Sequence, residues 1–139
     1  MIGNKIGRLG EDLVEKYLIG KGYEILHRNY WKPYGEIDIV CEKGDKTHFI
    51  EVKSVSCEIK YGSHMPVSSS VGSRSGENIR PEDNLHSTKL KKLARVIQVY
   101  ISVFHVKSWQ FDVITIYIDQ VNKKAEVRVL ENQILESGN

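Results

Sequence analysis

Apolar residues spaced three or four positions apart predict two helices in this chain. The first runs from about Ile6 to Ile19, with Asn4 as its N-terminal cap and Gly20 and Gly22 ending it. The second runs from Ser87 to Phe104. The apolar stripes are Ile6, Leu9, Leu13 and Tyr17 in the first helix and Leu90, Leu93, Ile97 and Ile101 in the second. Each helix therefore has one face that is expected to pack against a sheet.

Five other segments are rich in β-branched and apolar residues and predict strands. They are Tyr23 to Tyr30, Glu36 to Cys41, Lys46 to Val55, Trp109 to Ile118 and Glu126 to Leu130. The resulting order is one helix, three strands, one helix and two strands. It predicts an α/β fold in which a mixed sheet of about five strands is flanked by the two helices.

The turn at Gly44-Asp45 sets the register of the second and third strands. A two-residue hairpin loop there pairs Lys43 with Lys46 and places Asp38 opposite Glu51 and Glu36 opposite Lys53. The residues expected on the other face, toward the core, are Ile37, Ile39, Ile50 and Val52.

The remaining long segment, Ser56 to His86, is rich in Ser, Gly, Asn and Pro, which predicts a mobile loop. With 139 residues, of which 40% are hydrophobic and 27% charged, the chain fits one globular domain, residues 1–139. No apolar run approaches the ~20 residues of a membrane span. The N-terminal residues lack a secretion-signal pattern, so the cytoplasm is the expected location.

Two further features of the composition limit the choice of function. Cys41 and Cys57 are interpreted as structural thiols, because two cysteines are too few for a four-cysteine zinc site. The five histidines form no metal-ligand spacing, and we assign them no role. A net charge of +2 permits a nucleic-acid partner without requiring one.

Opposed carboxylates are the strongest chemical signal in the sequence. Asp38 and Glu51 would repel each other unless a positive charge lies between them, and Mg²⁺ prefers oxygen ligands of this kind. In phosphodiester hydrolysis such a cation polarises the phosphate, and an ammonium such as that of Lys53 stabilises the developing negative charge. The alternative is a solvated strand face with weak cross-strand ion pairs. Glu36 either pairs with Lys53 or lies at the edge of the site.

Several motifs together resemble the YraN-like family of predicted endonucleases, which are related to archaeal Holliday-junction resolvases within the PD-(D/E)xK superfamily. The matching segments are Gly7 to Glu11, Tyr17-Leu18, Lys21 to Leu26, Arg28 to Tyr30, Gly35 to Asp38, Phe49 to Lys53, Lys89 to Tyr100 and Phe111 to Ile114. They cover most of the chain outside the Ser56–His86 loop. The resemblance implies a restriction-endonuclease-like sheet.

The resemblance also implies roles for individual residues. Glu11, Asp38, Glu51 and the backbone carbonyl of Val52 would bind Mg²⁺ or Mn²⁺, with Lys53, Glu51 and Asp38 as the catalytic residues. Lys89, Lys92 and Arg95 would contact phosphate groups, although a solvated helix face explains them equally well. Asp112 occupies a family position, but we expect it to organise a structural hydrogen-bond network.

One departure from the family pattern concerns substrate recognition. The family usually follows the catalytic lysine with a small polar residue and an arginine, whereas this chain has Ser54-Val55-Ser56 and a longer loop.

The function expected from the resemblance is metal-dependent hydrolysis of DNA, including branched structures, by a protein that could act as a homodimer. One alternative is a non-catalytic nucleic-acid-binding or adaptor module that keeps the nuclease fold. Another is a structural homodimer that exchanges the Ser56–His86 loop.

Overall fold

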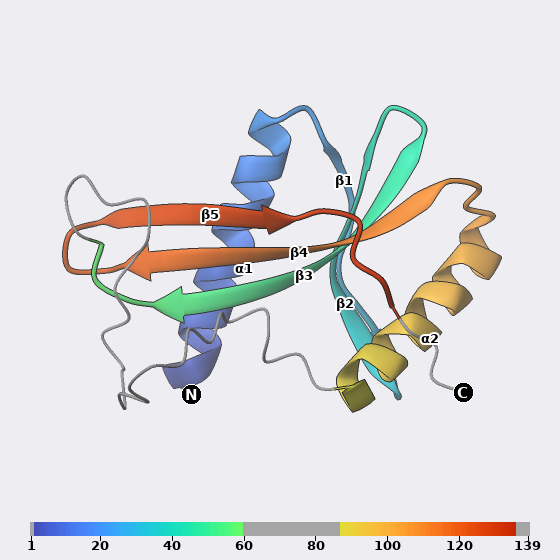
Figure 1. The fold of residues 1–139 in the computed structure, drawn as a ribbon, viewed down its shortest axis with the longest axis horizontal. Helices are drawn as coiled ribbons and strands as arrows, with labels where there is room; N and C mark the ends of the chain where they lie inside the picture. The colour runs from blue at the N-terminus through green and yellow to red at the C-terminus, as the bar shows by residue number, and fades with distance from the viewer. Residues whose placement is uncertain (1, 60–86, 136–139) are drawn as a thin grey trace.

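The computed structural model describes residues 2–59 and 87–135. Its elements are α1 (Ile2–Gly20), β1 (Glu24–Lys32), β2 (Gly35–Lys43), β3 (Lys46–Ser56), α2 (Ser87–Phe104), β4 (Trp109–Asp119) and β5 (Lys124–Leu130). Figure 1 shows the strands side by side with the two helices flanking them. The predicted order of elements is confirmed, and the bounds of α2 are those expected from the sequence.

The sheet is mixed, as predicted. Its strand order is β1-β2-β3-β4-β5, and only the β3–β4 pair is parallel. A parallel pair needs a crossover connection, and α2 lies in the segment between β3 and β4. The other neighbouring strands follow one another along the chain and pair in antiparallel fashion.

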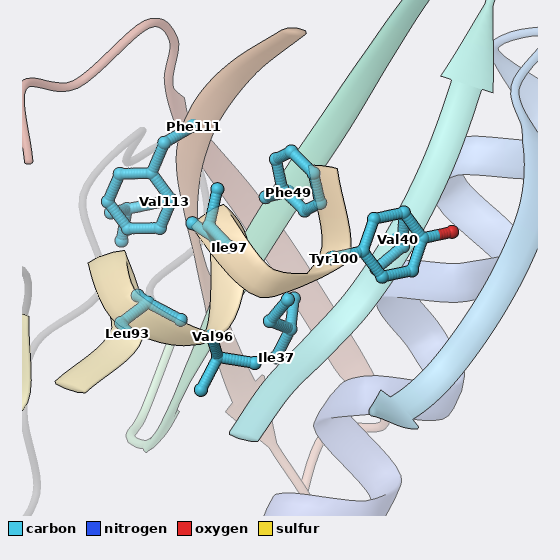
Figure 2. Packing of buried hydrophobic residues seen from close by; sticks show 9 residues of the cluster. All are labelled: Ile37, Val40, Phe49, Leu93, Val96, Ile97, Tyr100, Phe111 and Val113. Carbon is cyan, nitrogen blue, oxygen red and sulfur yellow. The ribbon is translucent and has the colours of Figure 1, made fainter. Parts of the chain in front are cut away.

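The two helices pack on opposite faces of the sheet, because neighbouring residues of a strand alternate between two cores. Figure 2 shows the core under α2, which consists of Ile37, Val40, Phe49, Leu93, Val96, Ile97, Tyr100, Phe111 and Val113. The core under α1 consists of Val14, Leu18, Ile39, Cys41, Ile50, Ile114, Ile116 and Ile118. The central strands are therefore buried on both faces.

The buried face of α1 agrees with the predicted one only in part, since Leu13 and Tyr17 pack against the core under α1. Gly10, Val14 and Leu18 are buried, whereas Leu9 is 37% exposed and Ile6 is half-buried. The prediction placed the largest apolar side chains in the core, but the helix contacts the sheet at Gly10, which has no side chain. The cap assignment was also wrong, because the helix begins at Ile2 and Asn4 lies inside it.

The strand alternation changes in the middle of β1 and β2. Ile37 packs in the core under α2, although Ile39 and Ile50 pack under α1, so the predicted shared face of these isoleucines is wrong. Opposite this point Asn29 has a φ of 52°, a left-handed conformation that asparagine tolerates better than most residues. A strand that contains such a residue cannot keep strict alternation of its side chains.

The loop after β3 begins later than predicted. The backbone N–H of Cys57 donates to the carbonyl of Ile118, and that of Ile59 donates to Asp119 Oδ2 at 2.9 Å. Cys57 and Ile59 are buried against Tyr117. Residues 60–86 of the predicted Ser56–His86 loop lie outside the described residues.

Both cysteines are buried free thiols, in agreement with a structural role. Within the described ranges, no helix is long and apolar enough to span a membrane.

Gly10 allows α1 to lie very close to the sheet. A Cβ atom at this position would overlap the Ser54 hydroxyl and stand 2.9 Å from Ser54 Cβ and 3.2 Å from Ile116 Cγ2. Any side chain would therefore push the helix away from β3 and β4. Because Glu11 is the next residue, the same close approach determines how far Glu11 stands from β3.

We expect Gly10→Ala to lower the free energy of unfolding by about 1–3 kcal/mol, the usual cost of overpacking. The matched control is Gly7→Ala on the same helix, where an added Cβ would meet nothing within 4 Å. That substitution should stabilise the protein by up to about 1 kcal/mol through helix propensity. Urea denaturation of both variants measures the difference, and equal effects would show that the contact at Gly10 is not tight.

Candidate active site

Asp38 on β2 and Glu51 on β3 lie where the two strands stop pairing. The paired register runs from Lys43–Lys46 at the turn to Ile39–Ile50. Beyond it, Asp38 Oδ2 accepts a hydrogen bond from the backbone N–H of Val52 at 2.8 Å. The predicted register is therefore confirmed from the turn to Ile39, and a side chain then replaces backbone pairing.

The carboxyl groups of Asp38 and Glu51 interact directly. Glu51 is 2% exposed and Asp38 is half-buried. Burial, a hydrogen bond with Glu51 and the negative charge of Glu51 raise the pKa of Asp38 to about 9, against the opposing effect of the Val52 N–H. Asp38 therefore holds a proton at neutral pH, which relieves the repulsion between the two groups.

Two lysines stand beside this carboxyl pair. Lys89, in the first turn of α2, places its Nζ 2.6 Å from Glu51 Oε2. Burial lowers the pKa of Lys89, but the hydrogen bond and charge of Glu51 outweigh this effect and raise it. For Lys53, burial and the positive charge of Lys89 lower the pKa below its ordinary value of 10.5. The site thus combines a strongly held cation with a second lysine that is easier to deprotonate.

Glu11 is held at the edge of the site by residues of β1. Asn29 Nδ2 donates to Glu11 Oε1 and to Glu36 Oε1, both at 2.9 Å. Arg28 Nη2 lies 3.3 Å from the same oxygen of Glu11. The charge of Glu11 contributes to the raised pKa of Asp38. Glu11 therefore acts electrostatically on the carboxyl pair, and Glu36 joins the same network through Asn29.

Arg28 and Asn29 are functional candidates that we did not single out from the sequence. Besides Glu11, Arg28 forms ion pairs with Asp12 at 3.3 Å and with Glu15 at 3.2 Å. Together these contacts attach one face of α1 to β1. The spacing of Glu11 and Glu15 places two carboxylates on one helix face, and this pattern could have predicted a basic partner such as Arg28.

The carboxylate oxygens of Asp38 and Glu51 are ligands of the kind that a hard divalent cation prefers, but Glu11 is not grouped with them. In the parts of the chain that the structure describes, no three His, Cys, Asp or Glu side chains are grouped so as to hold a metal ion. Asp38 and Glu51 are together, whereas Glu11 is held by its β1 partners. A buried pair of carboxyls is nevertheless what a divalent cation would stabilise. The chemistry of Asp38 and Glu51 therefore fits a divalent cation, whereas Glu11 is bound by Asn29 and Arg28 in this structure.

The three residues expected to contact phosphate have different surroundings. Lys89 belongs to the site itself through its ion pair with Glu51. Lys92 is exposed on α2. Arg95 is also exposed, and its guanidinium carbon lies 4.3 Å from the centre of the Tyr34 ring.

Asp112 lies in a structural network, as expected. Its carboxylate contacts His48 Nδ1 at 2.8 Å, Gln110 Nε2 at 2.7 Å and the backbone N–H of Asn132 at 2.8 Å. His48, to which we assigned no role, is thus a buried structural partner that joins β3 to β4. Asp119, also unforeseen, accepts hydrogen bonds from Ile59 and Asn122, which lower its pKa to about 2.

Comparison with known proteins gives the family. The model described as "Uncharacterised protein family UPF0102" matches residues 10–116. This chain belongs to the UPF0102 family. That family is the YraN-like, nuclease-fold family indicated by the sequence motifs. The matched segment of this UPF0102 chain includes Glu11, the β2–β3 hairpin, all of α2 and most of β4.

Similar UPF0102 proteins match almost over their full length. The protein of Dictyoglomus thermophilum is 31% identical over 134 residues, which is 95% of this chain and 98% of the relative. That of Clostridium tetani is 33% identical over 130 residues, or 92% of each chain. That of Caldicellulosiruptor saccharolyticus is 28% identical over 130 residues, or 92% of this chain and 95% of the relative.

We expect Asp38→Asn to raise the stability of the metal-free protein at neutral pH. The unfolded carboxyl ionises near its ordinary pKa of 3.8, whereas the folded one keeps its proton up to about pH 9. Folding therefore takes up a proton between these values, and stability falls as the pH rises through that window. Asparagine removes this dependence, so its advantage should grow with pH.

Denaturation in the presence of a chelator, at several pH values, measures this effect. Asp45→Asn, at the exposed hairpin turn, is the matched control and should leave the pH profile unchanged. A profile of Asp38→Asn that parallels that of the unsubstituted protein would contradict the raised pKa.

The ion pair between Lys89 and Glu51 gives a separate prediction. Lys89→Gln should lower the free energy of unfolding by about 1 kcal/mol, because the lysine is half in solvent and its charge is screened. The same substitution should have little effect in a Glu51→Gln background. Lys91→Gln, at an exposed position of the same helix, is the control. An equal loss in both backgrounds would show that the two side chains are not coupled.

Proposed function

We propose that this protein is a metal-dependent nuclease that hydrolyses phosphodiester bonds in nucleic acid, with DNA, including branched DNA, as its substrate. The observation that carries the proposal is the direct contact between the buried carboxyl groups of Asp38 and Glu51, with Lys53 and Lys89 beside them. Membership of the UPF0102 family agrees with it, since the family model matches residues 10–116, a range that contains all four residues.

Without a metal ion, the proton on Asp38 and the ion pair between Lys89 and Glu51 reduce the repulsion within the carboxyl pair. Each group removes the other from water and raises the energy of its ionised form. Mg²⁺ or Mn²⁺ would be held by Asp38, Glu51, Glu11 and the backbone carbonyl of Val52. When bound, the ion would act as a Lewis acid toward a phosphodiester oxygen and lower the pKa of water.

The lysines supply the positive charge that phosphodiester hydrolysis requires. The ammonium of Lys53 stabilises the negative charge that develops on the phosphoryl oxygens. Lys89 holds Glu51 in the absence of substrate and contacts a backbone phosphate in its presence. Lys92 and Arg95 extend the basic surface along α2, where they bind the phosphate backbone without reading base sequence.

The position of the Glu11 carboxylate is set by its contacts with β1. Arg28 and Asn29 hold its carboxylate away from the Asp38–Glu51 pair, and a cation placed at that pair would attract it.

The decisive test is cleavage of labelled single-stranded, duplex, flapped and four-way-junction DNA with Mg²⁺ or Mn²⁺. Lys53→Ala should reduce the rate by about 10²–10³-fold, the usual effect of removing one group that stabilises transition-state charge. Lys46→Ala, at an exposed position of the same strand, should cleave at the normal rate. Cleavage that is independent of metal, or that survives in Lys53→Ala, would contradict the proposed site.

Metal binding separates a nuclease from a non-catalytic adaptor with the same fold. Saturating Mn²⁺ should raise the melting temperature of the protein, since about 2.7 kcal/mol follows when the ion is present at a hundred times its Kd. Asp38→Asn should lose this shift and Asp45→Asn should keep it. An adaptor would show nucleic-acid binding with no metal-linked shift and no cleavage.

A further inference from the structure

Trp31, near the end of β1, is unusually exposed for its size. Its side chain is 65% exposed, although large aromatic residues are normally buried for most of their surface. The other tryptophan, Trp109, is half-buried and packs edge to face against Phe49. A largely exposed indole is therefore a particular feature of the end of β1.

The register places Trp31 opposite Glu36 at the end of β1, on the other face of the sheet from Tyr30 and Ile37, which pack under α2. Trp31 is directly paired with Glu36 across the two strands, and directly opposed residues lie on the same face with Cβ atoms about 5 Å apart. Glu36 shares the Asn29 amide with Glu11. Trp31 is thus separated from Glu11 only by this short hydrogen-bonded chain, at the rim of the site.

Basic residues surround the turn on which Trp31 lies. Figure 1 shows the β1–β2 turn beside the start of α2. Gly35 permits this contact, because a Cβ there would stand 3.3 Å from the Lys92 carbonyl oxygen and 3.0 Å from Val96 Cγ2. Lys92 therefore approaches the turn through its backbone, and the Arg95 guanidinium lies over the ring of Tyr34 in the turn. Lys32 ends β1 directly before the turn. An exposed aromatic side chain beside a turn that basic residues approach, and linked to Glu11 through Glu36 and Asn29, matches the chemistry of a nucleic-acid strand.

We propose that Trp31 stacks on an unpaired nucleobase of the substrate and so selects single-stranded nucleic acid, or the single-stranded part of a branched one, over a continuous duplex. This inference rests on the proposed nucleic-acid substrate. An indole can stack only on a base that has left its own stack, while the neighbouring lysines and arginine bind the backbone on either side. A continuous duplex would offer the same phosphates but no free base face.

Binding can be measured without cleavage, in a chelator and with the Asp38→Asn protein. Because the chain has two tryptophans, Trp109→Phe leaves Trp31 as the only indole fluorophore. A short oligothymidylate should quench the fluorescence of this variant, and the matching duplex should quench it far less. Trp31→Ala should weaken binding of the single strand by about 5- to 150-fold, the range expected for one base–aromatic stack.

Two controls test whether stacking itself is responsible. Trp31→Phe keeps an aromatic face and should retain most of the affinity, whereas Val121→Ala, at an exposed turn between β4 and β5, should have no effect. Thermal melting should be almost unchanged in all of these surface variants. Unchanged affinity in Trp31→Ala, unquenched fluorescence or equal quenching by duplex would each overturn the proposal.

The outcomes also separate this inference from the proposed function. Metal-dependent cleavage without quenching of Trp31 would leave the nuclease intact and remove the stacking role. Quenching by single strands without any cleavage would support the stacking role on a non-catalytic module. Absence of any nucleic-acid binding would overturn both.

Discussion

The structure is organised around an unfavourable contact, in which the carboxyl groups of Asp38 and Glu51 meet where β2 and β3 separate. Burial makes two negative charges costly there, and the surrounding groups reduce this cost in different ways. Asp38 keeps its proton and accepts the Val52 N–H, while Glu51 receives the ammonium of Lys89. These interactions reduce the electrostatic repulsion between the two carboxyl groups, but a divalent cation would supply more positive charge to the same oxygens. A divalent cation would replace both the proton and the ammonium.

Both helices reach this site through glycines that permit close backbone packing. Gly10 brings α1 against Ser54 and Ile116, and Gly35 brings the β1–β2 turn against the backbone of α2 at Lys92. A larger side chain at either position would overlap its neighbours and force the packed elements apart. Close packing at these points is therefore what allows polar residues from α1, β2, β3 and α2 to share one small region.

The sequence predicted those features that depend on local pattern. The hairpin at Gly44-Asp45 and the limits of α2 follow from turn chemistry and helical periodicity, and both were correct. The errors concern long-range packing. Leu9 was placed in the core of α1 because it is large, yet the position of the helix is decided by what Gly10 meets on β3 and β4. Ile37 was assigned to the wrong core because the alternation of β2 breaks between Ile37 and Ile39, opposite the left-handed Asn29 of β1. The capture of Glu11 by Arg28 and Asn29 likewise depends on tertiary contacts that spacing along the chain does not encode.

The Asp38–Glu51 pair does not contribute to folding stability, and this indicates a functional rather than a structural role. Well-packed apolar residues commonly replace buried ionic groups without loss of stability. Folding alone therefore gives no reason to place Asp38 against Glu51 in the central strands, which are otherwise largely buried on both faces. The Asp112 network provides the contrast within the same molecule, because each of its polar groups has a fixed partner and it connects strands. The Asp38–Glu51 pair instead has a proton on Asp38 and an ion pair from Glu51 to the half-exposed Lys89, and a bound cation would displace both. A polar cluster with replaceable partners is suited to binding a cation and a phosphate in turn, which a purely structural network is not.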